Sequence, residues 1–318
     1  MGKHWTLDDM PNQSGRRVII TGANSGIGYH AALELARNGA DVVLACRDGA
    51  RGEAALARLR QAVPNAQAEV AILDLASLSS VYEFAARETG RGAGLDLLIN
   101  NAGVMAPKKR LETKDELELQ FGTNVLGHFV LTALLFRALV RAAESSGERP
   151  RVVTLASIAH KRGWMNFDDL QSRKSYNPMG AYQQSKLANL MFALELDRRL
   201  RAATNPVSRI MSVAAHPGVA NTNLFQVGEF SVAERLARRG FGAAIHALLN
   251  SEAQGALPTL YAATAANVKD GGYYGPQGFQ EMRGWRVDSA QIAPHAIDRE
   301  VAERLWRECE RLANVKLL

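Results

Sequence analysis

Residues 17–28 read RVIITGANSGIG. The apolar run at the start predicts a strand, and the stretch from Gly26 onwards predicts a helix. A glycine-rich turn between a strand and a helix is typical of a phosphate site, because free N–H groups at the helix N-terminus meet the phosphate oxygens. In such a turn Gly22 permits the tight bend, Gly26 lets the backbone approach a pyrophosphate, and Gly28 lets the helix pack close to the sheet. The residues predicted to bind the cofactor phosphates are Gly22, Asn24, Ser25, Gly26, Ile27 and Gly28.

Short apolar runs alternate with helical stretches along the whole chain. The runs that predict strands lie at 17–20, 41–45, 69–73, 95–99, 151–155 and 209–213, with a last one at Tyr273 and Tyr274. The stretches that predict helices lie at 26–38, 49–62, 78–89, 116–144, 179–200 and 297–312. Strands that are almost wholly apolar need cover on both faces, which indicates a parallel sheet between two helical layers. We therefore predict an α/β Rossmann fold, a doubly wound parallel sheet of about seven strands with helices on both faces.

The chain shows no linker, repeat or low-complexity segment, so we expect a single domain over residues 1–318. A cofactor-binding half is expected at about 15–150, and a catalytic and substrate-binding half at about 151–318.

Composition excludes several classes of protein. The 318 residues are 47% hydrophobic and 22% charged, which is typical of a globular protein. The net charge of +6 comes from arginines scattered beside acidic residues without interleaved aromatic residues, so nucleic-acid binding is not expected. No run approaches the roughly 18 apolar residues of a membrane span, and the first residues lack an apolar signal core. The only two cysteines, Cys46 and Cys309, are far apart, which fits a reducing cytoplasm.

The second predicted strand ends in a sequence that bears on the type of dinucleotide. Enzymes that prefer NAD usually carry an acidic residue at this point, whereas an arginine can accept the 2′-phosphate of NADP. Here Arg47 follows Cys46, so we predict NADP(H) as the preferred cofactor. Asp48 keeps NAD(H) open, and Arg47 could instead merely begin the next helix. Asp74, with Leu75 beside it, could bind the adenine amino group or equally begin a helix.

Tyr182 and Lys186 are the residues that suggest chemistry rather than binding alone. They are four apart on the predicted helix at 179–200, so both side chains can point into the same space. A free tyrosine has a pKa of about 10, and a nearby positive charge lowers that pKa. A tyrosine brought towards the working pH can act as a general acid or base on a hydroxyl or carbonyl group.

Several motifs resemble those of the short-chain dehydrogenase/reductase family, over almost the whole chain. They are TGANSGIG at 21–28, Asn100-Asn101-Ala102-Gly103 after the fourth strand, and Tyr182-x-x-x-Lys186, in the family's order. Further local matches resemble the retinol-dehydrogenase-like branch and its bacterial oxidoreductases. They are Ala45-Cys46-Arg47-Asp48, Asn124-Val125-Leu126-Gly127-His128-Phe129, Ser185-Lys186-Leu187-Ala188-Asn189 and His216-Pro217-Gly218-Val219.

The resemblance implies a catalytic tetrad. Tyr182 would move the proton, and Lys186 would lower the pKa of Tyr182 and hold the nicotinamide ribose. Ser157 would bind the substrate oxygen, and Asn124 would hold a water that links Lys186 to solvent. Many family members have paired serines at the strand end, whereas this chain has Ala156 and Ser157. Further cofactor contacts are implied for Asn101, Ala102, Gly103, Pro217, Gly218, Val219 and Thr222. Val219 would bind the carboxamide through its backbone, and Thr222 would bind the carboxamide or a phosphate through its hydroxyl.

The implied function is hydride transfer between a nicotinamide and a carbonyl or alcohol, without a metal. The stretch at 219–250 is rich in apolar residues and suits a lid over an apolar substrate. The same stretch could instead be a dimer surface or a membrane-leaning face. The resemblance also implies a homodimer or homotetramer. Two rivals stay open: a non-catalytic dinucleotide sensor, and a sugar-nucleotide epimerase, whose usual TGxxGxxG differs from the TGxxxGxG of this chain.

Overall fold

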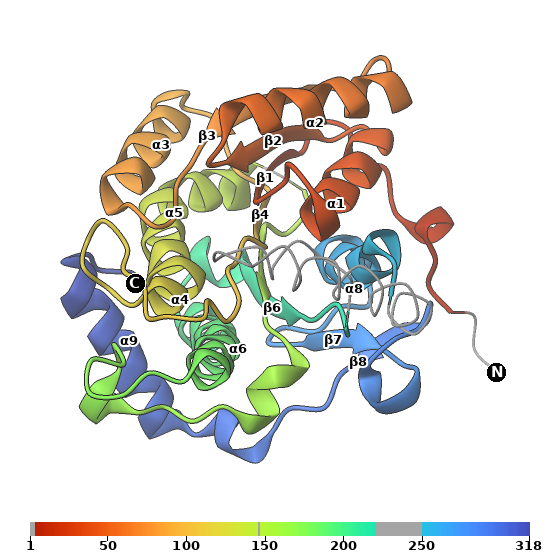
Figure 1. The fold of residues 1–318 in the computed structure, drawn as a ribbon. Coiled ribbons are helices and arrows are strands. Elements are labelled where there is room, and N and C mark those ends of the chain that lie inside the picture. Colours follow the sequence, from red (N-terminus) through yellow and green to blue (C-terminus); the bar gives the residue numbers. More distant parts are fainter. Residues whose placement is uncertain (1–3, 146, 220–249) are drawn as a thin grey trace.

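A computed structural model describes residues 4–145, 147–219 and 250–318, which form one sheet between helical layers (Figure 1). The sheet has eight strands in the order β3-β2-β1-β4-β5-β6-β7-β8. The strands are β1 Arg17–Thr21, β2 Asp41–Cys46, β3 Ala68–Ile72, β4 Leu97–Asn100, β5 Arg151–Leu155, β6 Met211–Ala215, β7 Tyr273–Pro276 and β8 Val287–Ser289. All neighbouring pairs are parallel except β7 and β8, which are antiparallel.

Two helical layers explain why the central strands are apolar throughout. One layer contains α1 Gly26–Arg37, α2 Gly49–Ala62 and α8 Glu252–Thr264. The other contains α3 Leu78–Gly90, α5 Gly127–Ser145, α6 Pro178–Ala202 and α9 Arg299–Ala313. Side chains alternate between the two layers along each strand. Ile19 of β1 therefore packs in the core under α3, α5, α6 and α9, while Val18 and Ile20 pack in the core under α1, α2 and α8. A polar residue at any of these positions would be buried without water.

The predicted fold class is confirmed, with differences in detail. The sheet has eight strands rather than about seven, because β8 has only three residues, one of them buried, and is too short to give a pattern. Helix α8 was not predicted, since Pro258 lies inside it and argues against a helix in the sequence. Strand β6 begins at Met211 instead of residue 209, because Val207–Arg209 form a short 3-10 turn.

The long helix predicted at 116–144 is interrupted. It begins as α4 Leu119–Phe121, passes through a π-helical turn at Gly122–Leu126 and continues as α5. One described helix has the length and composition of a membrane span, although the sequence contains no unbroken apolar run of that length. Leu119–Ser145 has 27 residues and a mean hydropathy of 1.6 over its most apolar window, of which 67% is buried in the fold, where α5 packs against α3 and β4. The predicted lid at 219–250 lies outside the described residues except for its two end residues.

Candidate active site

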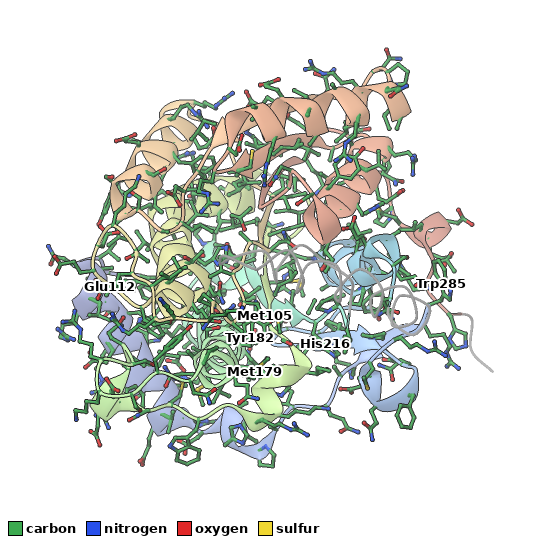
Figure 2. All side chains as sticks on the ribbon, viewed as in Figure 1. Met105, Glu112, Met179, Tyr182, His216 and Trp285 are labelled. Atoms are coloured by element: carbon green, nitrogen blue, oxygen red, sulfur yellow. The ribbon has the colours of Figure 1, made fainter. Side chains whose placement is uncertain are left out.

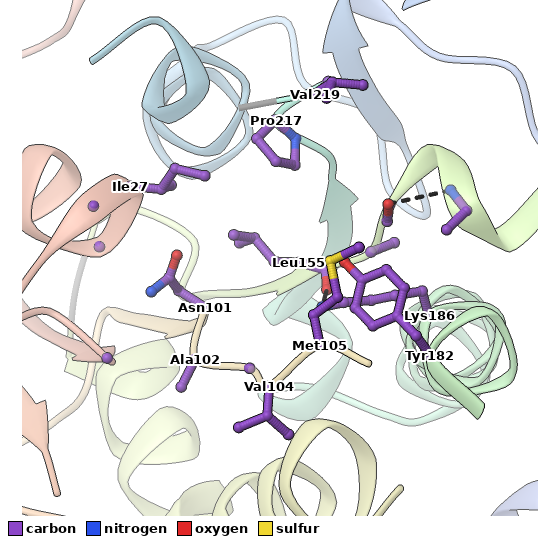
Figure 3. A pocket seen from close by; sticks show the side chains of 18 of the residues that line it. Ile27, Asn101, Ala102, Val104, Met105, Leu155, Tyr182, Lys186, Pro217 and Val219 are labelled. Carbon is purple, nitrogen blue, oxygen red and sulfur yellow. Dashed lines mark hydrogen bonds between the residues drawn. The ribbon is translucent and has the colours of Figure 1, made fainter. Parts of the chain in front are cut away.

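A cleft of about 1510 Å³ opens at the carboxyl ends of the parallel strands. It lies where the strand order reverses between β1 and β4, which is the position at which open α/β sheets bind ligands. Figure 3 shows Ile27 and Asn101 on one side of this cleft. On the opposite side it shows Tyr182 and Lys186. Tyr182 is buried, and Figure 2 labels it near the middle of the view. The structure therefore brings the predicted phosphate site and the predicted catalytic pair to one cleft.

The glycine-rich turn has the backbone that its predicted role requires. Gly22 and Gly26 have φ angles of +67° and +59°, which other residues adopt only with strain. A Cβ on Gly28 would lie 2.5 Å from the Gly22 carbonyl oxygen, so α1 can approach the turn only with glycine at this position. The predicted residues Gly22, Asn24, Ser25, Gly26, Ile27 and Gly28 all line the cleft.

Thr21, at the end of β1, holds the next predicted motif against this turn. Its Oγ1 accepts hydrogen bonds from the backbone N–H groups of Asn101 and Ala102, both at 2.9 Å. The Asn101 side chain donates to the Thr21 carbonyl oxygen at 2.7 Å. Asn101, Ala102 and Gly103 therefore line the cleft beside the glycine turn, as predicted.

Three arginines gather at the end of the cleft next to β2. Arg47 lines the cleft as predicted, and Arg51 and Arg58 of α2 line it as well. The Arg58 guanidinium lies 4.3 Å from the centre of the Tyr29 ring and donates to the Asn24 carbonyl oxygen at 3.5 Å. The sequence contained a signal for this pair, because Arg51 and Arg58 are seven apart and share a helix face.

The structure does not bring Asp74 or Leu75 to the cleft. The Asp74 carboxylate accepts a hydrogen bond from the Ala76 N–H at 3.1 Å and lies 3.8 Å from the Lys114 ammonium. Leu75 is 6% exposed and packs in the core. Helix α3 begins at Leu78 with Ser77 as its N-cap, so Asp74 lies in the turn before the helix and does not begin it. A contact of Asp74 with the adenine amino group stays a prediction.

Tyr182 and Lys186 lie on α6, which begins at Pro178 because the Asn177 side chain caps it by accepting from the Gly180 N–H at 2.7 Å. Both side chains line the cleft. The Lys186 Nζ lies 5.9 Å from the centre of the Tyr182 ring, so the two groups share one space, as their spacing predicted.

Burial dominates the electrostatics of this pair. Burial raises the pKa of Tyr182 to about 12, and a hydrogen bond with Ser157 acts in the opposite direction. Burial also lowers the pKa of Lys186 to about 8. The loss of water around the phenol is therefore the largest influence on the pKa of Tyr182. A lowering of the Tyr182 pKa by Lys186 stays a prediction.

Ser157 reaches the same cleft from the end of β5. Its Oγ accepts a hydrogen bond from the Ala159 N–H at 3.1 Å, which begins a 3-10 turn at Ile158–Arg162. The His160 ring is fixed below it, with Nδ1 2.7 Å from the Ser157 carbonyl oxygen and Nε2 accepting from the Ala293 N–H at 3.2 Å. The hydroxyl that faces the cleft thus sits on a rigid corner.

Asn124 is fully buried in the π-helical turn and does not line the cleft. Its Oδ1 accepts from the Val104 N–H at 2.8 Å, and its Nδ2 donates to the Val104 carbonyl and to the Ser185 hydroxyl, both at 3.0 Å. A Cβ on Gly103 would lie 3.2 Å from Asn124 Oδ1 and 3.7 Å from Lys186 Nζ. Glycine here therefore leaves space between the two groups, and a water-mediated link stays a prediction.

The turn after β6 is built by a distant part of the chain. Gly218 has a φ angle of +70°, and a Cβ there would lie 2.3 Å from the Met282 carbonyl oxygen. The Val219 N–H donates to that oxygen at 2.7 Å, and the Val219 carbonyl accepts from the Asn250 N–H at 3.0 Å. Both backbone groups of Val219 that were expected to meet a carboxamide are thus used within the protein.

Pro217, Gly218 and Val219 line the cleft, and Figure 3 shows Pro217 and Val219 at its edge. Thr222 lies outside the described residues.

The cleft is also lined by residues that the sequence did not indicate. Met105, Met179 and Met282 line it together with Val104 and Ile158. Met105 lies beside Tyr182 in Figure 3. Polar residues also line the cleft, namely Lys161, Arg162, Gln183, Gln280, Glu281 and Gln291. Met282 and Gln291 come from the segments around β8, far from the motifs in sequence, and no local pattern could have identified them.

Comparisons with known proteins give one consistent result. A family model described as short chain dehydrogenase matches residues 16–229. Retinol dehydrogenase 13 of Homo sapiens is 42% identical over 306 residues, which cover 95% of this chain and 86% of the relative. Polyprenol dehydrogenase of Mus musculus is 41% identical over 306 residues, covering 95% and 85% of the two chains. A crystal structure of an uncharacterized protein from Mycobacterium Paratuberculosis has a TM-score of 0.78 and 38% identity, covering 99% of this chain and 100% of the other.

Proposed function

The chain belongs to the short-chain dehydrogenase family, and from this premise we propose that it transfers a hydride between NADP(H) and the carbonyl or alcohol carbon of an apolar substrate. Family membership, together with relatives named as retinol and polyprenol dehydrogenases, makes it an NAD(P)-dependent oxidoreductase that acts on alcohols, as its motifs predicted. The preference for NADP(H), the role of Tyr182 and the class of substrate are the finer parts of the proposal.

The observation that carries the proposal is the meeting of two sites in one cleft. Tyr182, Lys186 and Ser157 line it together with the glycine turn that starts at Gly22. The residues fit a dinucleotide, because all three glycines of the turn line the cleft and α1 begins there at Gly26. When bound, the nicotinamide supplies or accepts the hydride.

The residues of the chain then handle the proton and the substrate oxygen. Ser157 Oγ holds the oxygen, and the Tyr182 hydroxyl gives a proton to it or takes one from it. With a pKa raised to about 12, Tyr182 is protonated at neutral pH, so it is ready to donate its proton to a carbonyl oxygen. Lys186 Nζ, beside the phenol, is the donor available to a ribose hydroxyl.

Two observations support NADP(H) over NAD(H). Arg47, Arg51 and Arg58 supply three positive side chains at the end of the cleft next to β2. Arginine binds phosphate through a planar fork of N–H donors, and NADP differs from NAD by one phosphate. Arg58 is also held in place by its contact with the Tyr29 ring.

An apolar substrate is supported by three methionines that line the cleft together with Tyr182. Met105, Met179 and Met282 offer flexible apolar surface that adapts to a ligand of irregular shape. The relatives at 42% and 41% identity are named for retinol and for polyprenol, both apolar alcohols. We propose an apolar alcohol or aldehyde of this kind for the present chain. A cytoplasmic location and a homodimer or homotetramer stay predictions from the sequence.

Turnover measurements with the purified protein test the proposal. NADPH and NADH are each offered with a panel of apolar aldehydes and ketones, and NADP with retinol and a polyprenol. We expect oxidation of NADPH by apolar carbonyls, with kcat/KM higher for NADPH than for NADH. Binding of NADPH without turnover of any substrate would favour the dinucleotide sensor instead.

A further inference from the structure

His128 lies on α5, one turn after Asn124, and is 1% exposed. Its Nδ1 lies 3.0 Å from the Asn124 carbonyl oxygen, and its Nε2 lies 2.9 Å from Thr21 Oγ1. One ring therefore spans the distance from the π-helical turn to the end of β1. The contact with Asn124 uses its main-chain carbonyl, whereas the resemblance gave Asn124 the role of holding a water. The sequence motif gave His128 no role.

The direction of each hydrogen bond follows from the chemistry of the atoms. The Asn124 carbonyl oxygen can only accept, so Nδ1 carries the proton and Nε2 is an acceptor. The Thr21 hydroxyl then donates to Nε2, since its other acceptor, the Ile99 carbonyl oxygen, is farther away at 3.4 Å. The lone pairs of the same hydroxyl accept from Asn101 and Ala102. Each hydrogen bond in this series is donated in the same direction, towards the Asn124 carbonyl oxygen.

The ring stays neutral at ordinary pH. Burial lowers the pKa of His128 to about 4, and the nearby Lys186 ammonium acts in the same direction. A protonated ring would place an N–H against the Thr21 hydroxyl, whose oxygen already accepts from Asn101 and Ala102. The hydroxyl proton would then be left with only the more distant Ile99 carbonyl oxygen.

This series of hydrogen bonds through Thr21 and His128 joins the two halves of the cleft. At one end, Thr21 precedes the glycine turn and holds Asn101 and Ala102 beside it. At the other end, the Asn124 side chain binds Val104 and the hydroxyl of Ser185, which is the neighbour of Lys186 on α6. We propose that His128 is a positioning residue that fixes the phosphate-binding turn and the Tyr182–Lys186 helix relative to each other. This inference rests on the proposed function of the cleft.

Two substitutions of similar shape separate the two bonds. In His128→Asn the amide nitrogen stands where Nδ1 stands, so the bond to Asn124 is kept and Thr21 loses its partner. In His128→Gln the amide reaches the place of Nε2, so the bond to Thr21 is kept and that to Asn124 is lost. His128→Phe keeps the ring and removes both bonds. His30→Asn, on α1 outside the cleft, is the control.

Three quantities are measured for each variant: the Kd for NADPH by fluorescence titration, kcat and KM at saturating NADPH, and Tm. Loss of the Thr21 bond should raise the Kd for NADPH about 5- to 30-fold in His128→Asn with kcat near wild type. Loss of the Asn124 bond should lower kcat in His128→Gln by a similar factor with little change in Kd. His128→Phe should show both effects.

A second arm uses the partner of the ring. Thr21→Val removes the bond to His128 and also the acceptor of the Asn101 and Ala102 N–H groups, so it should raise the Kd for NADPH in both backgrounds. Its effect should be smaller in the His128→Phe background, because the bond between the two side chains is already gone there. Additive effects would overturn the proposal. The proposal would also be overturned if all His128 variants lowered Tm equally while the Kd and kcat of the folded protein stayed at the wild-type values. That result is expected of a histidine with a purely structural role. If the wild type turns over no substrate, the proposed function fails, while the NADPH titrations still test the Thr21 arm.

Discussion

The Lys186 ammonium donates a hydrogen bond to the main-chain carbonyl oxygen of Leu155 at a distance of 3.0 Å. The Asn189 side chain, one turn later on α6, donates to the same oxygen at 3.1 Å. Leu155 ends β5 two residues before Ser157, so these bonds tie the helix of Tyr182 to the corner that carries the serine. The relative position of the three proposed catalytic side chains is thus set by the protein itself.

Burial of the Lys186 ammonium predicts a pH dependence of stability. Its pKa falls from 10.5 in the unfolded chain to about 8 in the fold, so the unfolded state binds more protons between these values. The stability linked to Lys186 is therefore present above pH 10.5 and is lost as the pH falls towards 8. We expect wild type to gain on the order of 2 kcal/mol relative to Lys186→Met between about pH 7.5 and 9.5, measured by urea unfolding.

The exposed Lys269 provides the control for this experiment, and Lys269→Met should follow the wild-type curve. Tyr182 has the opposite sign, because its pKa is raised from 10 to about 12 and its stability contribution is lost only as the pH rises above 10. Parallel curves for wild type and Lys186→Met below pH 10 would contradict the buried ammonium.

Removal of the Tyr182 hydroxyl tests the proton transfer. Tyr182→Phe should lower kcat by about 10²- to 10⁴-fold, which is the usual contribution of a general acid or base. The Kd for NADPH should stay at the wild-type value, because the phosphate-binding turn is unchanged. Tyr82→Phe, at an exposed tyrosine of α3 outside the cleft, should leave kcat unchanged. Unchanged turnover of the Tyr182 variant would show that Tyr182 does not transfer the proton.

The approach of α1 to the glycine turn can be tested with one methyl group. In Gly28→Ala the new Cβ would lie 2.5 Å from the Gly22 carbonyl oxygen, so the backbone of the turn must move. We expect the Kd for NADPH to rise at least about tenfold and the free energy of unfolding to fall by about 1–3 kcal/mol. NADPH titration and urea unfolding measure the two effects.

Gly90 is the matched control, because a Cβ there meets open space and its φ angle is ordinary. Gly90→Ala should be neutral, or stabilise the protein by about 0.4–1 kcal/mol. Tight NADPH binding by Gly28→Ala would show that the turn tolerates the movement and is not the phosphate site.

Arg58 tests the preference for the phosphorylated dinucleotide. Arg58→Ala should weaken NADPH binding by about tenfold, as one charge-assisted bond to the 2′-phosphate is lost, and leave the Kd for NADH unchanged. Arg87 is the control, because its guanidinium also lies over an aromatic ring, that of Phe84, but outside the cleft. Equal losses for NADPH and NADH would mean that Arg58 supports the fold of the turn and does not read the phosphate.

Much of the fold followed from local patterns. The nearly all-apolar strands β1, β2 and β5 were predicted within a residue of their observed ends, because burial on both faces leaves an unmistakable composition. Strand β8 was not predicted, because three residues are too few to show an alternating pattern. Helix α8 was not predicted, because a proline in the sequence usually indicates the end of a helix, and Pro258 lies inside this one. The glycine turn was correctly predicted because its backbone constraints act within eight residues.

The same contrast holds for the cleft, and it separates what the sequence by itself determined from what tertiary structure decided. The spacing of Tyr182 and Lys186 on one helix face and the glycines of the turn are local properties, so the sequence was sufficient to predict them. The raised pKa of Tyr182, the bond between Val219 and Met282, and the link from Asn124 through His128 to Thr21 were decided by folding. Each depends on burial or on partners more than 60 residues apart, and loss of water and long-range contact arise only when the chain has closed around them.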